Sequence, residues 1–319
     1  SSCSGRGPAA RLRPMPADRP AYTPGLLGRG FLRLLGHVPV PVAALLGHAF
    51  GWLAWKLDRR RRHIVRTNLV LCFPELDERS RDDLMRRHFL AFGRALLCAL
   101  AVGAGSRARL YRTVTVEGRR HYDEALAKGR GVILYAPHFT ALEMGGLRLS
   151  AERPMFAMYR EPRRHLFHWA VHRNRTHYGA ELIEREANMR HVIRRLGEGT
   201  PFYYLPDIDP GNSGSYEFVP FFGIPAATVT AVSRLARLAD ALVIPCITRE
   251  TGLGRYTATL YTPVEGVTGD DPASDTAVLN RWLENEVRKT PEQYFWIHRR
   301  FKTRPPGEPS PYEQPGQAA

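Results

Sequence analysis

The sequence predicts a single α/β domain with a largely parallel central sheet flanked by helices, preceded by a hydrophobic N-terminal helix. Two observations carry this fold class. From residue 114 onward, short apolar runs of strand length alternate with stretches of helix length, which is typical of a parallel sheet. Residues 38–57, by contrast, are almost uncharged and about as long as a bilayer is thick.

The first sixty residues predict a leader and an anchor. Residues 1–24 are rich in Pro, Arg, Ser and Gly and are expected to be disordered. Residues 25–62 form a membrane-anchoring segment, in which Trp52 and Trp55 precede the basic run 59–62. The helix either spans the membrane, with its basic end in the cytoplasm, or lies in the membrane plane. A buried amphipathic helix is the alternative without a membrane.

The α/β domain is expected over residues 63–308, followed by a loose tail at 309–319. Apolar positions at helical spacing predict a long amphipathic helix over 77–103. The predicted strands are 114–118, 131–137, 155–159, 181–183, 200–206, 241–250 and 255–263. The predicted helices between and after them are 120–128, 140–150, 163–178, 187–197, 226–239 and about 275–290.

Composition narrows the partners without choosing among them. The 319 residues carry 46 Lys and Arg against 31 Asp and Glu, a net charge of +15. Such a surface favours polyanions, which include nucleic acid, anionic lipid and acidic proteins. The four cysteines form no CxxC pair, which argues against a disulfide framework and a zinc knuckle and suits a reducing compartment.

The stretch "GVILYAPHFTALEMGG" (131–146) places His138 where a buried strand gives way to a helix. In parallel sheets chemistry collects at such strand ends, so His138 is a candidate general base, although a packed polar residue or a metal ligand has the same position. Glu143 can reach His138 from the first turn of the helix. Thr140 and Glu143 also match a capping box, which gives Glu143 a second possible role.

Other catalytic patterns are missing from the sequence. No GxSxG elbow is present, so His138 would activate a substrate hydroxyl directly. His165, His168 and His172 share one helical face, but no carboxylate or cysteine completes a metal site at ligand spacing.

Four stretches in order resemble one known family. His138-x4-Glu143 is similar to the motif of the lysophospholipid acyltransferase superfamily. Segments 66–76 ("RTNLVLCFPEL"), 205–245 and 291–308 ("PEQYFWIHRRFKTRPPGE") narrow the resemblance to the bacterial lipid A late acyltransferases. The resemblance covers about residues 26–308. The sequences "TALEMGG" at 140–146 and "DID" at 207–209 depart from the family's usual pattern and leave the identity of the acceptor lipid open.

The resemblance implies transfer of a fatty acyl chain from acyl carrier protein to a hydroxyl of a lipid A precursor, at the cytoplasmic face of the inner membrane. It implies no metal and no redox cofactor. Acyl carrier protein is acidic and the lipid precursor is phosphorylated, so both suit the basic surface, and an acceptor in the membrane explains the anchor. Nucleic acid is then not expected as a partner.

Site roles follow from the resemblance and from the chemistry. His138 would take the proton of the acceptor hydroxyl, and Glu143 would orient His138. Backbone N–H groups at the start of helix 140–150 would stabilise the oxyanion. Arg160 matches a family arginine at another strand end, with a surface arginine as the alternative.

Three further groups have one functional and one structural interpretation each. Asp207 and Asp209 would hold Arg160 or position substrate, or else form a turn. Phe218, Phe221 and Phe222 would line the acyl channel or pack in the core. Arg299 and Arg300, with Lys302 and Arg304, would face phosphate groups or form a solvated basic face.

The sequence leaves three other functions open. A nucleic-acid-binding protein would explain the +15 charge but not the apolar segment 38–57 or His138. Acyl transfer to another lipid hydroxyl, of a lysophospholipid or a glycolipid, would keep the proposed chemistry. A membrane scaffold without activity would keep only the fold.

Overall fold

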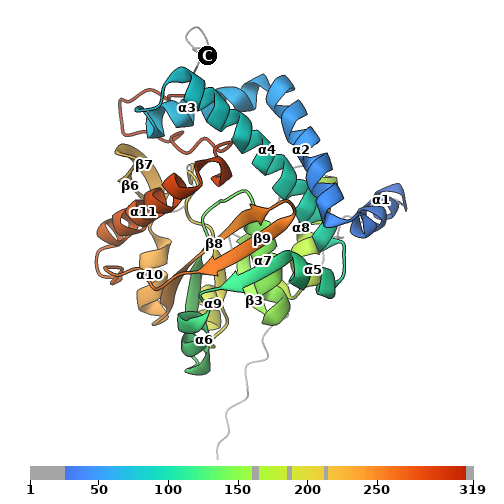
Figure 1. Cartoon of the computed structure of the whole chain (residues 1–319). Helices are drawn as coiled ribbons and strands as arrows, with labels where there is room; N and C mark the ends of the chain where they lie inside the picture. Colours follow the sequence, from blue (N-terminus) through green and yellow to red (C-terminus); the bar gives the residue numbers. More distant parts are fainter. Residues whose placement is uncertain (1–25, 160–164, 185–188, 212–214, 314–319) are drawn as a thin grey trace, which may run out of the picture.

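A computed structural model describes residues 26–159, 165–184, 189–211 and 215–313. Figure 1 shows a twisted sheet covered by helices, which confirms the predicted α/β class. The strands are β1 (Val114–Glu117), β2 (Val132–Tyr135), β3 (Met155–Tyr159), β4 (Ala180–Glu184), β5 (Phe202–Tyr204), β6 (Tyr216–Phe221), β7 (Ile224–Val229), β8 (Leu242–Gly252) and β9 (Arg255–Leu260).

The main sheet has seven strands in the order β1-β9-β8-β2-β5-β3-β4. Every neighbouring pair is parallel except β8 and β9, which form an antiparallel hairpin. The largely parallel sheet is therefore as predicted. Strand β2 lies at its centre and all four of its residues are buried. Ile133 and Tyr135 pack on one face of the sheet, and Val132 and Leu134 pack on the other.

The helices follow the predicted order with three additions. They are α1 (Leu26–His37), α2 (Val40–Leu57), α3 (Arg59–Cys72), α4 (Glu78–Gly103), α5 (Arg107–Thr113), α6 (Arg120–Ala127), α7 (Leu142–Glu152), α8 (His165–His177), α9 (Met189–Gly197), α10 (Ala231–Leu238), α11 (Pro272–Lys289) and the short 3₁₀ helix η1 (Pro291–Gln293). Helices α3 and α5 and the short η1 were not predicted. Asp77 caps α4, the long helix expected at 77–103, by accepting a hydrogen bond from the Ser80 N–H at 2.7 Å.

The predicted helix 226–239 is wrong in its first part. Residues 224–229 form β7, which pairs antiparallel with β6 in a two-stranded hairpin, and α10 begins only at Ala231. Phe222 and Gly223, at the tip, have φ of 53° and 75°. Two successive residues with positive φ are what a tight hairpin turn requires. The turn therefore overrides the helical composition of "AATVTAVSRLARLA".

The segment 25–62, expected to anchor the chain in a membrane, contains the two helices α1 and α2 and the start of α3. Helix α2 is the one helix in the described ranges that is long and apolar enough to cross a membrane. It runs beside α4 (Figure 1), and Gly47 and Gly51 face Gly93 at the contact. A Cβ added at Gly93 would lie 2.2 Å from the Gly47 carbonyl oxygen, so glycine permits the close approach. The basic run 59–62 begins α3.

The first part of the segment expected to be a loose tail is held in place. Tyr312, placed by the sequence in a loose tail at 309–319, is buried. Its hydroxyl donates to Asn68 Oδ1 at 2.5 Å and accepts the Phe301 N–H at 3.0 Å. Asn68 in turn donates to the carbonyls of Trp296 and His298. These contacts tie the C-terminal segment to α3.

Candidate active site

The carboxyl ends of β2 and β5 bring His138 and Asp207 together. The two strands are parallel neighbours, and Tyr135 pairs in register with Tyr204. His138 follows Tyr135 by three residues, and Asp207 follows Tyr204 by three. Because the register is shared, the two side chains leave the sheet at the same level of the same edge.

Two hydrogen bonds join this pair. Asp207 Oδ1 lies 2.6 Å from Nδ1 of the His138 ring, and Asp207 Oδ2 accepts the His138 backbone N–H at 2.9 Å. A carboxylate at Nδ1 favours the tautomer with its proton on that nitrogen. The lone pair of Nε2 is then the proton acceptor, as a general base requires.

Asp207 is a buried carboxylate with 0% of its side chain exposed. Burial alone would raise its pKa, but the charge and hydrogen bonds of His138 and the charge of Arg300 lower the pKa below its ordinary value. Tyr294 donates a further hydrogen bond to Asp207 Oδ2 at 3.1 Å. Asp207 is thus held ionised in a fixed orientation.

A C-terminal segment locks the turn that carries His138. The Phe295 N–H donates to the His138 carbonyl at 2.8 Å, and the Thr140 N–H donates to the Gln293 carbonyl at 2.7 Å. Phe139 and Tyr294 form an isolated antiparallel bridge. Residues far apart in the sequence therefore fix the position of the histidine.

Glu143 lies in the first turn of α7, as expected, but it binds another partner. Its carboxylate forms a bidentate ion pair with Arg175 of α8, with Nε to Oε2 at 2.9 Å and a second contact from Nη2 to Oε1. The prediction that Glu143 orients His138 by direct contact is thus corrected, because Asp207 occupies that place. The capping box is also absent: the N-cap is Ala141, and no side chain caps α7.

The charges of Glu143 and Arg175 stabilise each other. Burial alone would raise the pKa of Glu143, but the Arg175 guanidinium, with a smaller contribution from His138, lowers it. Glu143, Arg175 and His138 line the same cavity, so the pair belongs to the same site. The Arg175 side chain keeps 24% exposure and that of Glu143 keeps 32%, so water in the site screens part of their attraction.

A cavity of about 270 Å³ opens beside these groups. His138, Glu143 and Arg175 provide polar walls, together with Thr140 and Asn174. The remaining walls are mostly apolar and come from α4, α7 and α8: Phe92, Ala95, Leu96, Ala99, Leu100, Leu142, Leu147 and Val171, with Phe139, Leu205 and Phe295. An apolar chamber with a few convergent polar groups is the usual form of a small-molecule site.

The other acidic and basic candidates have structural partners. Asp209 accepts hydrogen bonds from the Gly211 N–H at 2.8 Å and the Thr303 N–H at 2.7 Å, which is the turn-forming alternative. Arg300 is buried and donates to the Ala227 carbonyl at 2.7 Å, so it does not face a solvated phosphate. Arg299 contacts the Tyr312 ring, and Arg304 donates to the Pro225 carbonyl. Arg160 and the side chains of His165 and His168 lie outside the described residues.

The phenylalanines expected in the acyl channel do not line the cavity beside His138. Phe221 is fully buried against Tyr294 and Phe301, and Phe222 packs on Phe73 and Trp296. Phe218 stacks edge-on with Tyr216 in β6. The core interpretation is therefore the right one for Phe221, and the apolar walls of the site come from α4 instead.

The amides proposed for the oxyanion are largely engaged. The Thr140, Leu142 and Met144 N–H groups donate to backbone carbonyls.

The guanidinium of Arg175 was not among the predicted residues, yet it lies in the cavity wall. One signal for the His–Asp pairing was readable in the sequence: "LYAPH" and "YYLPD" place His138 and Asp207 after matching apolar strands and a proline.

Comparison with known proteins shows the family of the chain. The family model described as bacterial lipid A biosynthesis acyltransferase matches residues 17–303. The chain is 34% identical over 295 residues to the lipid A biosynthesis lauroyltransferase of Escherichia coli K12, covering 92% of this chain and 96% of that protein. The palmitoleoyltransferase of the same organism is also 34% identical, with 92% and 95% coverage. Its myristoyltransferase is 30% identical over 276 residues, covering 86% and 84%.

The family match spans most of the chain and includes every group of the described site, and these relatives all transfer acyl groups in lipid A biosynthesis. The chain therefore belongs to the bacterial lipid A biosynthesis acyltransferase family and is an acyltransferase.

Proposed function

We propose that this acyltransferase moves a fatty acyl chain from the thioester of acyl carrier protein to a hydroxyl of a lipid A precursor, with His138 as the general base. One observation carries the proposal: a buried, ionised Asp207 holds Nδ1 of His138 at the mouth of an apolar cavity. Membership of the family supports a lipid A precursor as acceptor.

The reaction needs no covalent enzyme intermediate. Nε2 of His138 takes the proton of the acceptor hydroxyl while its oxygen attacks the thioester carbonyl carbon. The tetrahedral intermediate then collapses, the carbon–sulfur bond breaks, and the thiolate takes the proton from the His138 imidazolium. The products are an ester on the lipid and the free thiol of the carrier. Asp207 stabilises the imidazolium between the two steps.

Arg175 is the proposed donor for the oxyanion. Two of its nitrogens bind Glu143, which fixes the guanidinium in the cavity wall. Nη1 has no hydrogen bond among the described residues and is available to the developing negative charge. A preorganised cation in a largely apolar chamber stabilises such charge strongly. Glu143 is then a positioning residue for Arg175.

The acyl chain of the donor is proposed to lie against α4. Leu96, Ala99 and Leu100 contribute an apolar wall to the cavity, and Phe92 and Phe295 lie near His138. Burial of each methylene of an acyl chain contributes about 0.8 kcal/mol. The cavity thus supplies binding energy close to the reacting carbonyl.

The proposed location is the cytoplasmic face of the inner membrane. Helices α1 and α2 expose Phe31, Leu34, Leu45, Leu46 and Phe50, whose side chains are 43% exposed or more. Lys56 lies over the Trp52 and Trp55 rings, which is typical of a membrane interface. The net charge of +15 suits an acidic carrier protein and a phosphorylated lipid.

The proposal is tested by acyl transfer from a panel of acyl carrier protein thioesters to a lipid A precursor in detergent. Wild type and His138→Ala, each verified as folded by circular dichroism, are compared. We expect transfer by wild type and a loss of roughly 10² to 10⁴-fold in the variant, and the panel identifies the preferred chain length. Full activity of the variant would reject His138 as the base. No transfer by wild type beside an active relative would point to another acceptor lipid.

A further inference from the structure

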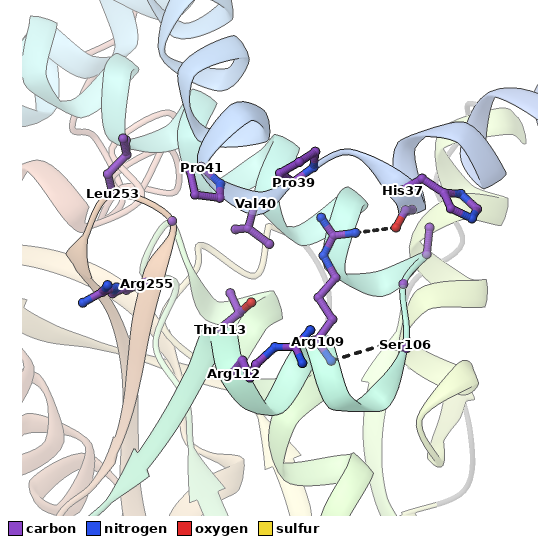
Figure 2. A pocket seen from close by; sticks show the side chains of 14 residues that line it. His37, Pro39, Val40, Pro41, Ser106, Arg109, Arg112, Thr113, Leu253 and Arg255 are labelled. Atoms are coloured by element: carbon purple, nitrogen blue, oxygen red, sulfur yellow. Dashed lines mark hydrogen bonds between the residues drawn. The ribbon is translucent and has the colours of Figure 1, made fainter.

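A second cavity, of about 800 Å³, lies away from His138, where α1 meets α2. Its walls come from the link between these helices, from α5, and from the tip of the β8–β9 hairpin (Figure 2). Four cationic or titratable side chains line it, namely His37, Arg109, Arg112 and Arg255. The proposed transfer reaction does not use any of them.

The positive charges in this cavity lack counter-charges. No Asp or Glu is among the described residues that line it. Arg112 and Arg255 are exposed and form no ion pair within the described part of the chain, whereas Arg61, Arg94 and Arg119 each pair with a carboxylate. Arg112 also lies close enough to Arg109 to contribute to a lowered pKa of that residue, although burial contributes more. Like charges gathered this way favour an anion.

The cavity is preformed by close backbone packing. Arg109 donates from its guanidinium to the Gly36 carbonyl (Figure 2) and to the Val38 carbonyl, and thereby fixes the link between α1 and α2. A Cβ at Gly36 would lie 2.6 Å from the Ala104 carbonyl oxygen, and one at Gly254 would lie 3.0 Å from Val40. A fixed wall means that little ordering is needed when a ligand binds.

One exposed apolar side chain lies in the cavity wall, and others lie on the two helices that meet there. Leu253, in the cavity wall itself, is 50% exposed, and Phe31 and Leu34 of α1 are 62% and 68% exposed. On α2, Leu45 and Leu46 are exposed as well. A soluble anion would not require such surroundings, whereas at a bilayer surface apolar groups enter the acyl region and cations meet the phosphate level.

We infer that this cavity binds the phosphate-bearing headgroup of an anionic membrane phospholipid, with Arg112 and Arg255 as its ligands and Leu253 inserted beside the acyl chains. Guanidinium groups match phosphate oxygens in geometry and charge. This inference goes beyond the proposed acyl transfer, because lipid binding here needs neither His138 nor the carrier protein. It would orient the enzyme on the membrane.

The test is binding of the full chain to three kinds of vesicle: phosphatidylcholine alone, phosphatidylcholine with phosphatidylglycerol, and phosphatidylcholine with oleate at equal surface charge. Wild type is compared with Arg112→Gln/Arg255→Gln. The matched control is Arg234→Gln/Arg281→Gln, which removes two exposed arginines from α10 and α11, away from α1 and α2 (Figure 1). All variants are first checked for unchanged thermal unfolding.

We expect the first pair to lose roughly ten- to thirtyfold in affinity for phosphatidylglycerol vesicles and clearly less for oleate vesicles, with little change in the control. Equal losses in both pairs, or equal losses on both anionic surfaces, would overturn the site in favour of general surface charge. Release of wild type by millimolar inorganic phosphate, with protection against heat, would make it a soluble-anion site and overturn the lipid assignment. Vesicle binding that no variant changes would reject this site and leave the transfer reaction untouched.

Discussion

At the scale of single residues, the two carboxylates of the site have different partners. Asp207 holds the His138 ring, and Glu143 holds Arg175. Both acids have lowered pKa values in spite of burial, each because of the cation or ring beside it. In the proposed mechanism one pair positions the base, and the other positions a donor for the negative charge.

This division makes a prediction for the Glu143–Arg175 pair. Glu143→Gln or Arg175→Gln alone leaves an uncompensated charge and should lower the free energy of unfolding by about 1 to 3 kcal/mol. The double variant Glu143→Gln/Arg175→Gln removes both charges and should recover most of that stability while transfer stays low. Urea unfolding and the transfer assay measure the two effects. A double variant that regains activity with its stability would contradict the role of Arg175.

The sequence predicted His138, Glu143 and Asp207 as site residues but paired them incorrectly. Spacing along the chain drew attention to His138 and Glu143, five residues apart. The partner of His138 is set by which strands are neighbours and in what register, and paired residues of β2 and β5 are 69 positions apart in the sequence. Local spacing contains no information about that pairing. Arg175 was not predicted as a site residue for the same reason, since it reaches the site from a separate helix.

At the scale of elements, α2 and α4 pack closely against each other at glycines. Gly93→Ala should destabilise the protein by about 1 to 3 kcal/mol, because its Cβ would lie 2.2 Å from the Gly47 carbonyl oxygen and the helices would have to move apart. The matched control is Gly197→Ala at the end of α9, where no atom lies within 4 Å of the new Cβ. The control should be neutral or slightly stabilising. Thermal unfolding of the two variants side by side measures the difference, and equal midpoints would contradict the packing argument.

Helices and strands with a clear apolar periodicity were predictable from the sequence, and those defined by tertiary contacts were not. The strand at 155–159 and the helix at 77–103 agree closely with β3 and α4, because their apolar periodicity is strong. The hairpin of β6 and β7 was missed, because its turn depends on positive φ at Phe222, a residue that rarely adopts it. Helix-favouring alanines after the turn then suggested a helix where β7 lies.

At the scale of the whole molecule, the buried His88 and the half-buried His298 make stability depend on pH. Burial lowers the pKa of His88 and of His298 from 6.5 to about 4. Between about pH 6.5 and 4 the unfolded chain binds protons that the folded chain does not, so the free energy of unfolding falls as the pH is lowered through this window. Above this pH window the two histidines do not change the free energy of unfolding with pH.

His88→Gln should therefore make the loss of stability between pH 6.5 and 4.5 shallower. Glutamine keeps a donor for the Glu292 carbonyl, which His88 Nδ1 contacts at 3.1 Å. Urea unfolding at several pH values measures the slope, with His121→Gln, a partly exposed histidine of α6, as the control for loss of an imidazole. An unchanged slope in His88→Gln would contradict the assignment.

The central claim is that Asp207, by holding Nδ1 of His138, makes this site an acyltransferase. It is tested most directly by kcat for acyl transfer in Asp207→Asn beside Asp209→Asn. An amide at position 207 would donate to Nδ1, leave the proton on Nε2, and lower kcat on the order of 10³ to 10⁴-fold in a folded protein. Asparagine at 209 can still accept the Thr303 N–H, so transfer should stay near wild type. Equal activity of the two variants would contradict the account.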